Sequence, residues 1–191
     1  MARGKSERSA AGCSDGGKGA GLRVRDARPA DREWAVGVLR ERWGSTTIIS
    51  RGCALDAAGL PALIAERVAP RDGPGELPAP REPVGLATYA LDRDACQLVT
   101  LDALRPRTGI GARLLEALAR AAAARGCARL WLITTNDNLD ALRFYQRRGL
   151  RVVAVHRGAV DRARRLKPSI PLVGAYGIEI HDELELELAL S

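Results

Sequence analysis

The chain has 191 residues, of which 46% are hydrophobic and 28% are charged, as expected for a globular domain with a real core. Its formal net charge is +7, but only three of its thirty Lys and Arg residues are lysines, so an arginine-rich bias explains the charge as well as a polyanionic partner does. We therefore do not expect nucleic acid as a partner. The four cysteines are far apart and there are only two histidines, so neither a zinc site nor a disulfide framework is expected.

The beginning of the chain differs in composition from the rest. Residues 1–21 are rich in Gly, Ser, Lys and Arg and predict a disordered tail, whereas residues 22–191 are expected to form one domain. No run of residues approaches the roughly 18 apolar residues that a membrane span needs. The sequence thus predicts a soluble, cytoplasmic protein that stays out of the membrane, and it leaves a homodimer open.

The first elements of the domain are a strand and a helix. Residues 22–25 alternate like a strand. Asp31 is a plausible N-cap for a helix that Gly44 ends. Residues 46–50 are β-branched and indicate a short strand or an extended edge.

An antiparallel meander follows. Residues 60–68 favour helix by composition and strand by position, and we prefer the strand. Residues 69–83 hold many prolines and glycines and predict a long exposed loop. Strands are then expected over 84–91 and 96–103, joined by a tight turn at 92–94.

The second half of the domain alternates helices and strands. In chain order we expect a helix opened by Gly109, a strand over 128–134, a helix over 139–148, a strand over 150–155, a basic helix over 156–167, a loop over 168–180 and a strand over 183–188. The order strand, helix, strand around Gly109 implies a right-handed crossover between parallel neighbours. Residues 183–188 alternate Glu and Leu strictly, which is typical of a half-exposed strand.

The turn that precedes the Gly109 helix is a candidate anion site. The apolar strand 97–101 enters it, and Gly109 and Gly111 let backbone N–H groups approach an anion without a Cβ in the way. Arg105 and Arg107 add positive charge nearby. The alternative is a strand–turn–helix junction whose glycines serve the backbone geometry alone.

A second motif lies one strand later. It is N-x-x-A-x-x-x-Y-x-x-x-G-L, formed here by Asn138, Ala141, Tyr145, Gly149 and Leu150. Together with the strand and the G-x-G helix, it resembles the GNAT superfamily of acyl-CoA N-acyltransferases. The first motif of that family is commonly Q/R-x-x-G-x-G/A, whereas this chain has Pro106 at the first position, so Arg105 or Arg107 would stand in for the basic residue.

The resemblance implies an α/β (α+β) fold. Its mixed sheet would have about six to seven strands, with an antiparallel N-terminal meander and a parallel centre, flanked by about four helices. It also implies acetyl-CoA as co-substrate, with no metal. The implied partner is a small-molecule or peptide amine as acceptor.

The resemblance further implies a set of site residues. Backbone amides from Arg107 to Ala112 would hold the pyrophosphate, the end of the strand would pair with the pantetheine arm, and Tyr145 would be the general acid to the thiolate. The implied coenzyme-binding residues are Leu101, Asp102, Ala103, Arg105, Arg107, Thr108, Gly109, Ile110, Gly111, Ala112, Asn138 and Tyr145.

The residues themselves leave alternatives for these roles. Asn138 could be a helix N-cap, and Tyr145 could be a core aromatic. The base that takes the proton of the amine is open among Asp102, His156, Asp161, Glu179 and water. Trp43 is expected in the core or in a pocket wall, and the acceptor pocket is expected near residues 43–53 and 157–177.

Other functions compete with acetyl transfer. A non-catalytic module on the same fold could sense acyl-CoA or bind nucleic acid. A dinucleotide-binding oxidoreductase also has a strand, a G-x-G turn and a helix, but Leu114 stands here in the place of its third glycine. A P-loop is excluded because no G-K-S/T follows the glycines.

Overall fold

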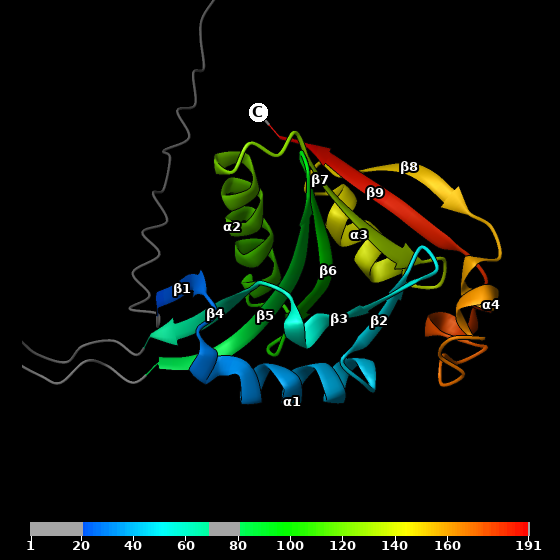
Figure 1. Cartoon of the computed structure of the whole chain (residues 1–191), viewed down its shortest axis with the longest axis horizontal. Helices are drawn as coiled ribbons and strands as arrows, with labels where there is room; N and C mark the ends of the chain where they lie inside the picture. Colours follow the sequence, from blue (N-terminus) through cyan, green and yellow to red (C-terminus); the bar gives the residue numbers. More distant parts are fainter. Residues whose placement is uncertain (1–20, 69–80, 191) are drawn as a thin grey trace, which may run out of the picture.

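A computed structural model describes residues 21–68 and 81–190, and Figure 1 shows a central twisted sheet with helices packed against it. The strands are β1 (Gly21–Asp26), β2 (Thr47–Ser50), β3 (Cys53–Asp56), β4 (Ala62–Val68), β5 (Arg81–Asp92), β6 (Ala95–Ala103), β7 (Arg129–Thr135), β8 (Arg151–His156) and β9 (Glu183–Ala189). The helices are α1 (Arg32–Trp43), α2 (Ile110–Ala124), α3 (Leu139–Gln146) and α4 (Ala159–Ala163). Except for Gly21, the predicted tail lies outside the described residues, as do residues 69–80 of the predicted loop.

Seven strands form one mixed sheet in the order β1-β4-β5-β6-β7-β9-β8, and β2 and β3 form a separate hairpin. β4, β5 and β6 are antiparallel neighbours, which confirms the meander, and the turn between β5 and β6 contains Arg93 with φ +49°. β6 and β7 are parallel and are connected through α2, which confirms the parallel centre. The predicted fold class is therefore correct.

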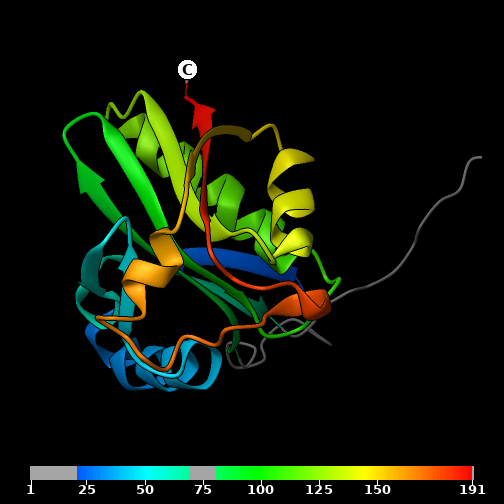
Figure 2. The same cartoon turned by 90° about the vertical axis from the view of Figure 1, so that its right-hand side faces the viewer.

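Two apolar layers hold the helices against the sheet. On one face α2 and α3 pack over a core that includes the fully buried Leu114 and Leu118. On the other face α1 packs with the β2–β3 hairpin around the buried Leu39 and Ile48. Figure 2 shows α1 and the hairpin on the side of the sheet opposite α2 and α3.

The two central strands separate partway along their length. The ladder between β6 and β7 ends at the pair Leu98 and Leu132, although both strands continue beyond it. At the same level the ladder between β5 and β6 shifts register and leaves Val99 as an additional residue in β6. Such a bulge bends a strand and increases its twist. We infer that it turns the end of β6 away from β7 and opens the sheet there.

Near the start of the fold, one predicted boundary was wrong, and one residue at a predicted helix N-cap has a different side-chain role. Residues 81–83, predicted as loop, begin β5, where Pro83 pairs with Glu66 at a register shift that tolerates a proline. Asp31 does precede α1, but its side chain does not cap that helix. Its carboxylate accepts from the backbone N–H of Arg28 and pairs with Arg25 at 2.6 Å.

The basic helix predicted over 156–167 is shorter than expected. His156 ends β8, and α4 covers only Ala159–Ala163. The residue before α4 is Gly158, with φ +64°, and its N–H donates to Asp182 Oδ1 at 2.7 Å. The first residues of the predicted helix therefore end β8 and form this turn, although their composition favours a helix.

β9 is the predicted Glu-Leu strand, but it is not half-exposed. It lies between β7 and β8, so both of its edges are paired. Glu183 and Glu185 are 3% and 7% exposed. The backbone N–H of Arg51 donates to Glu183, and His156 bonds Glu185 at 2.8 Å, so each buried carboxylate has a partner.

Candidate active site

A small cavity lies where β6 and β7 separate. Its volume is about 120 Å³, and Trp43 and residues of β2 form part of its wall. The residues that line it are Trp43, Ile48, Ile49, Ser50, Gln97, Leu98, Val99, Ile133, Thr134, Thr135, Asn138 and Glu183. The parted strands therefore enclose a site in the middle of the sheet.

A larger cavity of about 490 Å³ continues from the small one. The two share Trp43, Ile48, Ile49, Thr135 and Glu183. Its other lining residues are Arg42, Gly44, Val160, Ala163, Lys167, Ser169, Ile170 and Pro171. These come from the end of α1 and from the segment around and after α4, and all but Arg42 fall in the two regions where the sequence predicted the acceptor pocket.

The turn between β6 and α2 presents backbone N–H groups. Gly109, just before α2, has φ +80°, which glycine adopts without strain. The N–H of Arg113 bonds back to Gly109 O at 3.0 Å, whereas the amides before it have no acceptor within the helix. Gly111 lies against Phe144, where a Cβ would stand 3.3 Å from the ring. With the positive end of the helix dipole, these amides suit an anion such as a diphosphate.

The arginines near this turn have different surroundings. Arg105 Nη2 donates to Glu82 Oε1 and Oε2 at 2.9 and 3.1 Å, which holds its guanidinium at β5. Arg107 is exposed and has φ +61°. The hydroxyl of Thr108 donates to Arg105 O at 2.7 Å and closes the turn. Of the two predicted substitutes for the basic residue of the motif, Arg107 is the more accessible.

Asn138 and Tyr145 lie at the two ends of α3. Asn138 Oδ1 accepts from the backbone N–H of Ala141 at 3.2 Å, which confirms the N-cap, and Asn138 also lines the small cavity. Tyr145 packs edge to face on Phe144, with ring centres 5.1 Å apart, against the core between α3 and the sheet. It is not among the residues that line either of the two cavities described above.

The pKa of the Tyr145 phenol is raised above its ordinary value. Burial is the main cause, and the negative charge of Asp102 raises it further. Asp102 is itself buried, and burial raises the pKa of its carboxyl to about 6, against the opposing effects of a Trp43 hydrogen bond and the Arg42 charge. The phenol therefore keeps its proton at neutral pH.

Glu183 is a site residue that the sequence analysis missed. Its side chain lines both cavities and is 3% exposed. Glu183 Oε2 accepts from the Arg51 N–H at 3.0 Å, and Oε1 has no hydrogen-bond partner among residues 21–68 and 81–190. Burial raises the pKa of the carboxyl, opposed first by the hydrogen bond from Arg51. The strict Glu-Leu alternation looked like a solvated strand face, so no sequence signal singled this glutamate out.

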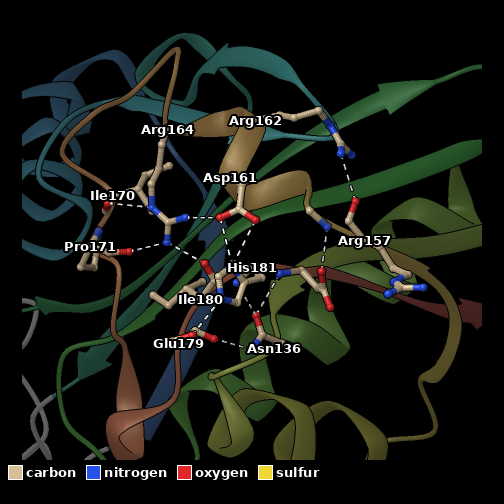
Figure 3. A network of polar contacts seen from close by, with 12 residues as sticks. Asn136, Arg157, Asp161, Arg162, Arg164, Ile170, Pro171, Glu179, Ile180 and His181 are labelled. Carbon is tan, nitrogen blue, oxygen red and sulfur yellow. Dashed lines mark hydrogen bonds and ion pairs between the residues drawn. The ribbon is translucent and has the colours of Figure 1, made fainter.

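The four side chains considered as the base lie elsewhere. Asp102, His156, Asp161 and Glu179 are not among the lining residues of either cavity, within the part of the chain that the structure describes. His156 bonds the buried Glu185. Asp161 and Glu179 both bond the exposed imidazole of His181, as Figure 3 shows.

The network in Figure 3 fixes the segment that walls the large cavity. Asn136, after β7, accepts from the backbone N–H groups of His181 and Asp182 and donates to Glu179 O. Arg164 donates to the carbonyl oxygens of Ile170, Pro171 and Ile180 at 3.3, 2.7 and 2.6 Å, respectively, and pairs with Asp161. Side chains far apart in sequence thus hold the chain between α4 and β9 in place.

The amino-acid sequence matches a known protein family and a bacterial relative. Residues 62–150 match the model of the acetyltransferase (GNAT) family. The chain is also 45% identical over 115 residues to YxbD of Bacillus subtilis (strain 168), a match covering 60% of this chain and 72% of YxbD. The chain belongs to the GNAT family. This GNAT chain therefore has acetyl transfer as its general class of reaction.

Solved structures show the same fold as this GNAT chain. An IAA acetyltransferase from Bacillus cereus ATCC 14579 superposes with a TM-score of 0.60 at 15% identity, covering 89% of this chain and all (100%) of that one. An acetyltransferase of Bacillus subtilis, solved in complex with CoA, gives a TM-score of 0.58 at 16% identity, covering 90% of this chain and 100% of that one. Within the described ranges, none of the helices is both long and apolar enough to cross a bilayer.

Proposed function

We propose that this protein transfers the acetyl group of acetyl-CoA directly to an amine. The observation that carries the proposal is the separation of β6 from β7 beyond Leu98 and Leu132, next to a glycine turn that opens α2. A parted strand offers unpaired backbone groups to an extended arm, and the turn offers N–H groups to phosphates. The structure of a Bacillus subtilis GNAT acetyltransferase in complex with CoA supports the choice of coenzyme.

The residues present fit the coenzyme. Amides from Arg107 to Ala112 would hold the pyrophosphate, with Arg107 as the accessible side-chain cation. The free edge of β6 from Leu101 to Ala103 would bond the pantetheine arm. Asn138, in the wall of the small cavity, would contact the coenzyme from the β7 side.

The chemistry needs no covalent enzyme intermediate. The amine nitrogen attacks the thioester carbonyl, the new C–N bond forms, and the C–S bond breaks with its electrons going to sulfur. Holding the two reactants together supplies several kcal/mol of the barrier. A backbone N–H at the parted strand would stabilise the negative charge on the carbonyl oxygen. The thiolate takes a proton from Tyr145, and the proton that the nitrogen loses as the amide forms restores the phenol through solvent, so the charges balance.

Two measurements on the purified protein test the proposal. Calorimetric titration with acetyl-CoA and with NAD should show binding of acetyl-CoA alone. Release of free thiol from acetyl-CoA should then depend on an added amine. Binding without thiol release for any amine, or nucleic acid bound to the purified protein, would favour the non-catalytic module. Binding of NAD without acetyl-CoA would favour the oxidoreductase.

A further inference from the structure

The large cavity has one carboxylate and a mainly apolar wall. Glu183 is the only acidic residue among those that line it, within the described part of the chain. The apolar wall consists of Trp43, Ile48, Ile49, Val160, Ile170 and Pro171. A volume of about 490 Å³ is within the range of small-molecule sites. The cavity therefore suits a compact molecule with one positive charge.

Glu183 is placed to meet that charge. Its side chain is buried at the junction of the two cavities, and only one of its oxygens is bonded among the described residues, to the Arg51 N–H. The other oxygen, Oε1, is left to accept a hydrogen bond from an ammonium, and such a charge-assisted bond is short and strong. An amine bound there would lie next to the small cavity between the parted strands.

Lys167 lines the large cavity and bridges two parts of its wall. Its Nζ donates to Trp43 O at 3.0 Å and to Thr47 O at 2.9 Å. These bonds join the segment after α4 to the turn between α1 and β2, so the two walls of the cavity are tied together across it. The N-terminus of a folded polypeptide would have to enter the cavity past this bridge.

The wall behind Lys167 is also held firmly. Arg164, whose side chain is only 14% exposed, donates to three backbone carbonyls and pairs with Asp161. Two of those carbonyls belong to Ile170 and Pro171, which line the cavity. The cavity is thus formed before the acceptor binds, which favours a ligand that fits its shape.

The two other charged residues in the wall are both cations. They are Arg42 and Lys167, at the end of α1 and after α4. A second ammonium on the acceptor would face these positive charges, and like charges brought together cost several kcal/mol. The wall therefore disfavours polyamines.

Resting on the proposed function, the geometry points to the acceptor: a small primary monoamine with an apolar body, whose nitrogen binds Glu183 and whose body fills the large cavity. Glu183 then takes the ammonium proton, which frees the nitrogen lone pair for attack on the thioester. Polyamines and polypeptide N-termini are poor acceptors.

A panel of acceptors tests this on the unmodified chain with saturating acetyl-CoA. Phenethylamine, spermidine and a short peptide with a free N-terminus are compared by thiol release. We expect kcat/KM for phenethylamine to exceed both others by at least about tenfold. Equal or faster turnover of the peptide or of spermidine overturns the inference. Failure to bind acetyl-CoA at all counts instead against the proposed function.

Two pairs of variants locate the effect. Glu183→Gln should lower kcat/KM for phenethylamine by about 100-fold and leave acetyl-CoA affinity unchanged, whereas Glu187→Gln, on the same strand but paired with Arg129, should change neither.

Lys167→Met keeps the aliphatic stem and removes the two hydrogen bonds to Trp43 O and Thr47 O, so peptide turnover relative to phenethylamine should rise. The exposed Arg165→Met is its control. An unaltered rate in Glu183→Gln contradicts the assignment, and the acceptor panel decides even if Lys167→Met does not fold.

Discussion

The indole N–H of Trp43 donates to both carboxylate oxygens of Asp102, at 3.1 Å from each. Trp43 ends α1 and lines both cavities, while Asp102 lies on the part of β6 that has separated from β7. This contact ties the wall of the proposed acceptor cavity to the strand proposed to bind the coenzyme. The buried Asp102 carboxyl group thus has the neutral indole N–H of Trp43 as its hydrogen-bond donor.

Asp102→Asn should stabilise the protein at pH 8 but not at pH 4. The folded pKa of Asp102 is about 6, above the ordinary 3.8, so the stabilising contribution of its protonated form is complete below pH 3.8 and is lost as the pH rises through 6. Asparagine can still accept from Trp43 and carries no charge. The gain at pH 8 should be about 2 kcal/mol, measured by urea unfolding at both pH values. The exposed Asp92→Asn is the control, and an equal gain at both pH values would contradict the reasoning.

Tyr145→Phe should slow thiol release without weakening the binding of acetyl-CoA. The phenol is proposed to protonate the leaving thiolate, and general acids typically contribute at least about 100-fold. Phenylalanine keeps the packing on Phe144 and the core. Initial rates of thiol release and calorimetric affinity separate the two effects. An unchanged rate removes the tyrosine from the acid role.

Gly109→Ala should weaken acetyl-CoA binding as well as folding. At φ +80° an alanine is strained, at a cost of about 1 kcal/mol in the free energy of unfolding. The added Cβ meets no protein atom within 4 Å and would occupy the space beside the amides proposed to hold the pyrophosphate. Gly126→Ala, at φ +82° and equally open after α2, is the matched control. It should lose similar stability and keep its affinity; equal affinity losses would argue against the phosphate site.

The pH dependence of turnover should show an acidic limb from Glu183. The glutamate must be ionised to accept a proton, so kcat/KM should fall as the pH drops through a pKa that burial raises above the ordinary 4.5. Opposing this shift are the Arg51 N–H and the charges of His156, Arg162 and Arg51. A pH–rate profile of Glu183→Gln should lack this limb. A limb that persists in the variant would belong to another group.

Apart from β3, which was not predicted, the predicted order of elements was correct because local periodicity and glycine positions determine it. The Gly109 turn with its helix and the Asn138 N-cap are confirmed, since each depends on residues adjacent in sequence. The length of α4 was overestimated because composition favours helix over 156–167, whereas the bond from Gly158 to Asp182 comes from a distant segment.

The sequence by itself determined the fold, the glycine turn that opens α2 and two regions that contribute most of the wall of the large cavity. Only the tertiary structure decided which charged groups meet there. Glu183 is buried because β9 inserts between β7 and β8. Lys167 bridges the cavity wall because its carbonyl acceptors, Trp43 O and Thr47 O, are brought to it across the fold. Such contacts join residues more than a hundred positions apart and depend on strand order, which no local pattern of side chains encodes.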